Sequence, residues 1–120
     1  MITEDYVSFE IAKLLKEKGF DEGCRARYGT AGSFSYEKYE IESGGCEMHN
    51  AILAPTIQMA MKWLREKHNI HVYVENYGSL GWIFVLHKLN EGNKIWSNEF
   101  NSTYEQACES AIKYCLENLV

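Results

Sequence analysis

Hydrophobic and polar residues recur along the chain with two different periods, and the change of period predicts the order of the elements. Three segments show the helical period of three to four residues: 8–18, 55–69 and 102–119. Five segments show the alternation or the β-branched and aromatic content of strands: 25–28, 34–41, 70–77, 81–89 and 94–100. The predicted order is therefore helix, β-hairpin, helix, three strands and helix.

Residues with capping chemistry mark the ends of the predicted helices. Ser8 can accept a backbone N–H as the N-cap of the first helix, and Gly19 stands where a left-handed residue ends it. Pro55 suits the first position of the second helix. Ser102 and Glu105 have the spacing of a capping box, which predicts that the third helix begins there.

The strand at 81–89 is apolar on both faces and is predicted to be the middle strand of an antiparallel meander. An odd-length turn before it places Val72 and Val74 opposite Leu86 and Phe84. This register gathers these apolar side chains on one face, whereas a slip of one residue would mix the two faces.

These patterns predict an α+β fold in a single domain over residues 1–120. Its centre is an antiparallel three-stranded meander with helices packed on one face, in the order α, β-hairpin, α, β, β, β, α. The hairpin of residues 25–41 is expected to extend the meander or to cover it.

The composition fits one folded domain with an acidic surface. The chain has 120 residues, and a hydrophobic share of 46% suffices for one core and not for two. The formal net charge of −5 disfavours binding to nucleic acid or to anionic membrane, since both require clustered cations.

No targeting or membrane segment is visible. The first residues are acidic where a signal peptide would be basic, and the longest apolar run, 82–86, is too short to span a bilayer. The expected location is the cytoplasm, where the four cysteines would be reduced thiols.

One pair of residues has the spacing of half a zinc site. Cys46 and His49 are three positions apart, and Cys24 could join them. A structural zinc site needs four ligands, usually in two close pairs, and no second pair is present. The sequence therefore favours a buried thiol and a surface imidazole over a metal site.

The other reactive side chains have structural explanations. Cys108 and Cys115 lie seven positions apart on one helical face, as expected of two core thiols. His71 and His87 face each other in the expected register, and two imidazoles alone make a weak metal site. No nucleophile has a recognisable base beside it, so we expect no catalytic residues and no cofactor.

The second face of the predicted meander is apolar and must be covered or used. Its residues are expected to be Tyr73, Ile83 and Val85, with either Ile95 or Trp96 beside them. The candidate interaction face is therefore taken as Tyr73, Ile83, Val85 and Trp96. The segment 20–50 could cover it, or a partner protein or a second copy could bind it. A third alternative is stacking of single-stranded nucleic acid on its aromatic rings.

Residues 55–120 have the α-β-β-β-α order of double-stranded RNA-binding domains, and the opening at 55–58 resembles the start of such a domain. That family places lysines at the start of its last helix to contact phosphates. Residues 103–109 contain Glu105 and Glu109 instead. The resemblance therefore implies a similar topology without RNA binding.

A second resemblance covers about a third of the chain. It is carried by three helical phrases at residues 6–20, 54–66 and 103–119. They resemble a group of small proteins of gut anaerobic bacteria, often encoded in prophage-like regions. The resemblance implies a bacterial or phage-related origin and supplies no activity and no functional residues.

The sequence thus favours a non-catalytic protein-binding or accessory protein. Its partner is an unknown protein or a second copy of the chain, with neither membrane nor nucleic acid expected. Nucleic-acid binding is the alternative function, and an enzyme ranks third because no nucleophile, base and orienting group can be assembled.

Overall fold

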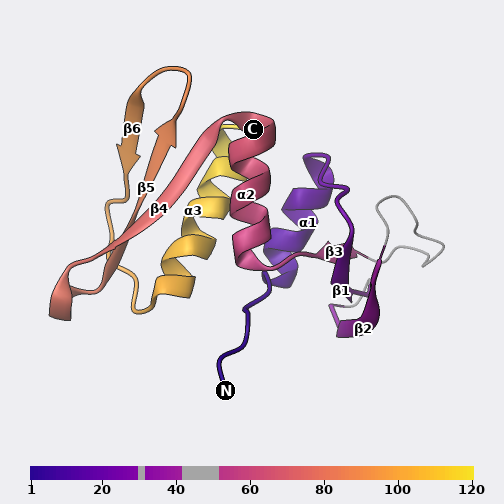
Figure 1. The fold of residues 1–120 in the computed structure, drawn as a ribbon. Coiled ribbons are helices and arrows are strands. Elements are labelled where there is room, and N and C mark those ends of the chain that lie inside the picture. Colours follow the sequence, from indigo (N-terminus) through magenta and orange to yellow (C-terminus); the bar gives the residue numbers. More distant parts are fainter. Residues whose placement is uncertain (30–31, 42–51) are drawn as a thin grey trace. The chain divides into compact units, whose positions relative to one another are not determined.

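The computed structural model describes residues 1–29, 32–41 and 52–120 (Figure 1). The chain divides into two units, residues 1–56 and 57–120, and each contains its own three-stranded antiparallel sheet. The first unit contains α1 (Phe9–Glu17), β1 (Cys24–Tyr28), β2 (Phe34–Ile41) and β3 (Ile52–Ala54). The second contains α2 (Ile57–His68), β4 (Ile70–Asn76), the short 3-10 helix η1 (Gly78–Leu80), β5 (Trp82–Lys88), β6 (Asn93–Trp96) and α3 (Tyr104–Asn118).

This arrangement confirms the predicted α+β class with an antiparallel meander. The single domain predicted over residues 1–120 stays a prediction.

Both predicted ends of α1 are confirmed. The Ser8 Oγ accepts the backbone N–H of Ile11 at 3.3 Å, which satisfies one of the unpaired donors at the helix start. At the other end, Gly19 has φ +93°, and the N–H of Phe20 donates to the Leu15 carbonyl at 2.9 Å. This hydrogen bond closes a Schellman motif and folds the buried Phe20 ring back on the helix.

The predicted hairpin belongs to a separate sheet. β1 pairs with β2, and the register shifts between the pairs Cys24–Ile41 and Ala26–Tyr36, as at a β-bulge. On its other side β1 pairs with β3, so the strand order is β2-β1-β3. The expectation that residues 25–41 extend the meander is therefore wrong. The three residues of β3 are too few to show a period, so this strand was not predicted.

The start of α2 also differs from the prediction. Pro55 precedes the helix, which begins at Ile57. The Pro55 carbonyl accepts the N–H of Val7 at 3.0 Å, and Thr56 forms a bridge with Tyr6. A proline φ near −65° suits an extended segment as well as a first helical turn. Pairing with residues 6–7 therefore keeps this segment extended.

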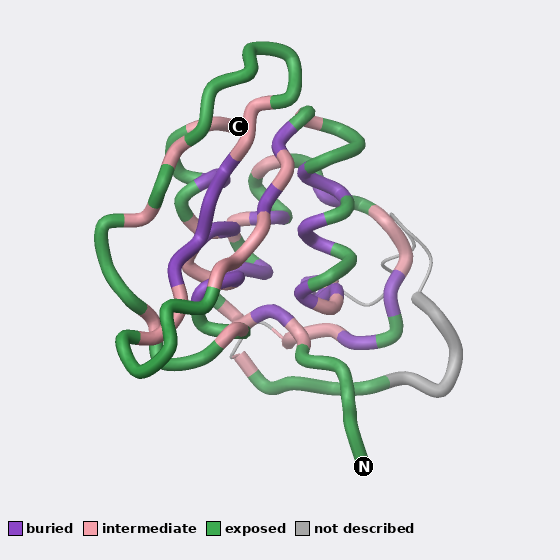
Figure 2. Tube along the Cα trace, turned by 60° about the vertical axis from the view of Figure 1, so that its left-hand side comes forward, coloured by how far each residue is buried: buried purple, intermediate pink, exposed green. Residues whose placement is uncertain are grey.

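The register of the meander is as predicted. Val72 pairs with Leu86 and Val74 pairs with Phe84, within a sheet of order β4-β5-β6. α2 and α3 lie on the same side of this sheet, where α2 packs on β4 and α3 packs on β4 and β5 (Figure 1). Figure 2 shows the middle strand β5 buried along most of its length.

β6 is shorter than predicted, because the chain leaves the sheet after Trp96. The N–H of Ser97 still donates to the Phe84 carbonyl at 3.0 Å, but the Phe84 N–H donates to the Ser97 Oγ at 3.1 Å. The chain returns at Asn101, which exchanges two hydrogen bonds with Trp82 at 2.7 and 2.9 Å. A regular ladder would place residue 99 there, so two extra residues bulge out of the strand.

Gly81 permits this return. Its φ is +113°, and a Cβ built on it would lie 2.5 Å from the carbonyl oxygen of Asn101. Only glycine tolerates both the backbone conformation and the close approach.

The cap of α3 lies one residue later than predicted. The Thr103 Oγ1 accepts the N–H of Gln106 at 3.1 Å, and the Gln106 side chain accepts the N–H of Ser102 at 3.2 Å. Thr103 and Gln106 satisfy the same S/T-x-x-E/Q pattern as Ser102 and Glu105, so the pattern alone did not show which of the two residues is the N-cap.

Candidate functional site

The face of the β4-β5-β6 sheet that points away from α2 and α3 is called the outer face here. The ladder register assigns eight residues to it: His71, Tyr73, Glu75, Ile83, Val85, His87, Lys94 and Trp96. All four residues of the predicted interaction face are among them. Tyr73, Val85 and Trp96 form one row across the three strands, and Ile83 lies in the next row.

The four predicted residues differ in exposure. Val85 is fully buried and Ile83 is 8% exposed, whereas Trp96 is 48% exposed and Tyr73 is half-buried. Val85 lies between Tyr73 and Trp96, whose large side chains flank it on both neighbouring strands. Val85 and Ile83 therefore form the floor of the outer face, and the two aromatic rings are the parts that a partner could contact.

Basic and aromatic side chains surround this row. His71 stacks on Tyr73 with ring centroids 5.5 Å apart, and the Lys94 Nζ lies 6.0 Å from the Tyr73 ring centroid. His71 is directly opposite His87, as the predicted register required. The outer face thus combines aromatic surface with one exposed cation.

Within residues 1–29, 32–41 and 52–120, no three His, Cys, Asp or Glu side chains come together in a group that could hold a metal ion. Cys46 and His49, the half-site suggested by the sequence, lie outside the described residues. Cys24 is buried and donates its Sγ–H to the Ala26 carbonyl at 3.4 Å.

The thiols of α3 are buried in the second unit. Burial raises the pKa of Cys108 to about 11 and the pKa of Cys115 to about 12, because an apolar environment disfavours the thiolate. Both thiols are free, and neither is ionised near neutral pH. This chemistry is that of core residues and not of nucleophiles.

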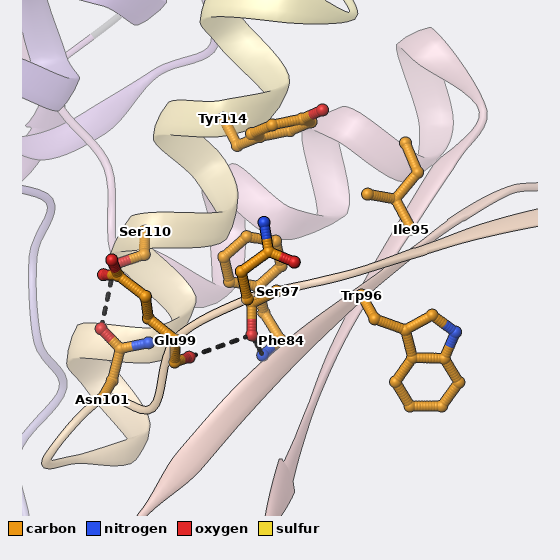
Figure 3. Close-up of a pocket in the computed structure, with 9 residues that line it drawn as sticks. Phe84, Ile95, Trp96, Ser97, Glu99, Asn101, Ser110 and Tyr114 are labelled. Atoms are coloured by element: carbon orange, nitrogen blue, oxygen red, sulfur yellow. Dashed lines mark hydrogen bonds between the residues drawn. The ribbon is translucent and has the colours of Figure 1, made fainter.

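A groove lies on the opposite side of the sheet, between the β5–β6 strands and α3 (Figure 3). Its volume is about 440 Å³. Nine residues line it: Phe84, Ile95, Trp96, Ser97, Asn98, Glu99, Asn101, Ser110 and Tyr114. The groove exists because α3 packs on β4 and β5, which leaves the helix side of β6 open.

The groove has an apolar part and a polar wall. The rings of Phe84 and Tyr114 lie 6.3 Å apart and are tilted by 45° to each other. On the wall, the Ser110 hydroxyl donates to the Asn101 Oδ1 at 3.1 Å (Figure 3). The nine lining residues include no histidine, cysteine or lysine. The one carboxylate in the lining is that of Glu99, and the remaining polar side chains are serine and tyrosine hydroxyls and asparagine amides, which can form hydrogen bonds with a ligand.

The sequence did not predict this groove. The sequence contains only a weak indication of the groove. The alternation of apolar residues stops after Trp96, and the polar run 97–99 follows where a strand was expected. The register also decides a choice that the sequence left open. Trp96 belongs to the outer face, and Ile95 points over the groove (Figure 3).

Comparisons with known proteins add no relative. The chain matches no protein-family model, no curated protein and no solved structure. In the described part of the chain, no helix combines the length and the apolar character needed to cross a membrane.

Proposed function

We propose that this chain is a non-catalytic protein-binding domain that acts as an accessory protein, and that its outer face contacts the partner. The observation that carries the proposal is Trp96, which is 48% exposed on the outer face beside the fully buried Val85. A large aromatic side chain held in place on a sheet resembles the anchor residues of protein interfaces.

The surroundings of Trp96 support a binding role. Tyr73 is in the same row, and the buried Val85 between them fixes the spacing of the two rings. Tyrosine and tryptophan are enriched in interface cores, because they bury much area at a small entropic cost. The proposal extends to the cytoplasm of a bacterium and to a phage or mobile element, on the sequence resemblance alone.

The test is recovery of protein partners from a lysate of the native host by the tagged chain, followed by mass spectrometry. Trp96→Ala and Tyr73→Ala remove the two accessible rings. Because Val85 is fully buried, a change there would disturb folding as well as binding, and it is unsuitable. We expect Trp96→Ala to weaken recovery of a specific partner roughly thirtyfold, the effect of losing about 2 kcal/mol at an interface anchor.

Leu80→Ser is the matched control. Leu80 is 64% exposed in η1, outside the outer face, so its loss removes apolar surface elsewhere in the same unit. A partner retained by the Leu80 variant and lost by the Trp96 variant supports the proposal. Equal recovery by all variants contradicts a role for the outer face.

Nucleic-acid binding is the second candidate. Lys94 lies beside Tyr73 and Trp96 on the outer face, a combination found on platforms that stack single-stranded bases. The net charge of −5 opposes it. A nuclease-treated arm of the lysate experiment and a heparin column at low salt distinguish the two. Retention on heparin together with nuclease-sensitive recovery would favour nucleic acid.

A further inference from the structure

β6 is an edge of its sheet, because it pairs with β5 and with no other strand among the described residues. In an antiparallel ladder, successive residues point their backbone N–H and C=O groups alternately toward the partner strand and away from it. Ser97 donates its N–H to β5, so Ile95 also points its backbone groups there. The backbone groups of Lys94 and Trp96 therefore point outward.

The two edges of the sheet differ in the space beside them. α2 packs on β4, and a second copy added at β4 would bring its own α2 against this helix. Packed helices need about 8–10 Å between their axes, whereas neighbouring strands are only about 4.8 Å apart. The two α2 helices would therefore obstruct strand pairing at β4. The open groove lies on the helix side of β6 (Figure 3). This groove leaves space for the sheet of a second copy to approach the β6 edge.

Three antiparallel registers would align the outward groups of two β6 strands. One places Lys94 opposite Lys94 of the second copy, where like charges repel. Another places Lys94 opposite Asn98, which lies beyond the end of β6. The third places Lys94 opposite Trp96 and centres the two-fold axis on Ile95.

We propose that two copies of this chain associate by antiparallel pairing of their β6 strands in this third register. The inference rests on the proposed function and deepens it, because it names the partner as a second copy of the chain. The pairing forms four backbone hydrogen bonds between Lys94 and Trp96 of the two copies, and it joins the two meanders into one six-stranded sheet.

Charge complementarity selects this register. Lys94 lies on the outer face with Trp96, and the two-fold axis brings each Lys94 beside the indole of the second copy. Within one chain its Nζ is 6.0 Å from the Tyr73 centroid, at the outer limit of a cation–π contact. Tryptophan is the strongest cation–π acceptor among the side chains, so pairing improves the contact.

Ile95 provides apolar contact on the other side of the strand. It is half-buried and points over the groove (Figure 3). In the proposed register it forms the close, non-hydrogen-bonded pair with Ile95 of the second copy, with Cα atoms about 4.5 Å apart. The pair would cover the open end of each groove.

The first test is sedimentation velocity of the purified full chain over a wide concentration range. We expect the wild type to shift toward a dimer as concentration rises, Lys94→Glu to stay monomeric, and Lys94→Arg to dimerise. Lys67→Glu is the control, because Lys67 is exposed on α2 and the variant changes the charge equally. It should dimerise as the wild type does.

The second test determines the register in which the two β6 strands pair. Ile95→Cys, in a Cys46→Ser background, should form an intermolecular disulfide on mild oxidation, since the Cα separation lies within the range for that bond. Asn93→Cys is the control: its Cα atoms would be about 14 Å apart in this register, because the two positions are four residues out of alignment on neighbouring strands. Cys24, Cys108 and Cys115 are buried and do not compete.

A protein that stays monomeric and shows no more disulfide with Ile95→Cys than with Asn93→Cys overturns the inference. A dimer that is indifferent to Lys94→Glu also overturns it, since another surface would then associate. If either result accompanies a Trp96-dependent partner in the lysate, the proposed function stands without self-association. A Lys94-dependent dimer with no other partner in the lysate supports the inference.

Discussion

Gly81 shows how one residue positions a surface. Its φ is +113°, and any Cβ at this position would lie 2.5 Å from the Asn101 carbonyl oxygen, which leaves no room for a side chain. Asn101 in turn anchors the end of the bulge and accepts the hydroxyl of Ser110. The shape of the groove therefore depends on a glycine that does not line it.

We predict that Gly81→Ala lowers the free energy of unfolding by more than about 2 kcal/mol, since it adds a steric clash to the strain of a left-handed backbone. Urea denaturation measures the change. Gly78→Ala is the control: Gly78 also has positive φ, at +62°, but a Cβ there meets nothing within 4 Å. Its cost should be about 1 kcal/mol. Equal losses in the two variants would contradict a specific contact at Asn101.

At the residue scale, the sequence predicted which residues lie on the outer face, but it did not predict how exposed their side chains are. The alternation placed Tyr73, Val85 and Trp96 together because the period of a strand is two. It could not tell that Val85 is covered by its neighbours, since burial within a face depends on the side chains of adjacent strands. The close approach at Gly81 was equally invisible, because the residue that causes it, Asn101, is distant in the sequence.

Among the elements, α3 has the most sharply defined start. Thr103 is the N-cap, and Gln106 completes the reciprocal contact through the N–H of Ser102. The Ser102 side chain has no role in this arrangement, since only its backbone takes part.

We predict that Thr103→Ala lowers the free energy of unfolding by about 1 kcal/mol, because the N–H of Gln106 loses its acceptor. Ser102→Ala should change it by less than about 0.5 kcal/mol, as an exposed substitution outside the cap. Thermal or urea denaturation of the two variants shows whether Thr103 or Ser102 is the N-cap of α3. A larger loss of unfolding free energy for Ser102→Ala than for Thr103→Ala would indicate that Ser102 is the N-cap.

The elements whose boundaries the sequence missed are those that depend on distant pairing. α2 begins late because Pro55 and Thr56 bond to residues 6–7. β6 ends early because the Ser97 hydroxyl takes the place of a backbone acceptor for Phe84. Local periodicity contains neither interaction, whereas the middle strand and the meander register follow from it directly.

At the scale of the whole molecule, Cys108 and Cys115 link stability to alkaline pH. Their pKa values in the folded chain are about 11 and about 12, above the value of 9.0 for a solvated thiol. A raised pKa means that the folded state holds its protons more tightly than the unfolded state. The resulting stability is fully present below pH 9 and is lost as the pH rises toward these folded values.

We predict that raising the pH from 8 to 10 lowers the free energy of unfolding by about 2–3 kcal/mol through these two thiols. Urea denaturation under reducing conditions measures the loss. The double variant Cys108→Ala/Cys115→Ala is the control: it should be less stable at pH 8 but lose less between pH 8 and pH 10. An equal loss in the variant would assign the effect to other groups.

The same titration tests whether residues 1–120 form a single domain. Both thiols and all three tryptophans belong to residues 57–120, so tryptophan fluorescence follows only that unit. Far-UV circular dichroism follows the helices of both units. A single domain requires the two signals to unfold together at pH 8 and to shift together at pH 10. If the fluorescence transition shifts and part of the dichroism signal does not, the two units unfold independently, and the alkaline loss belongs to the second unit alone.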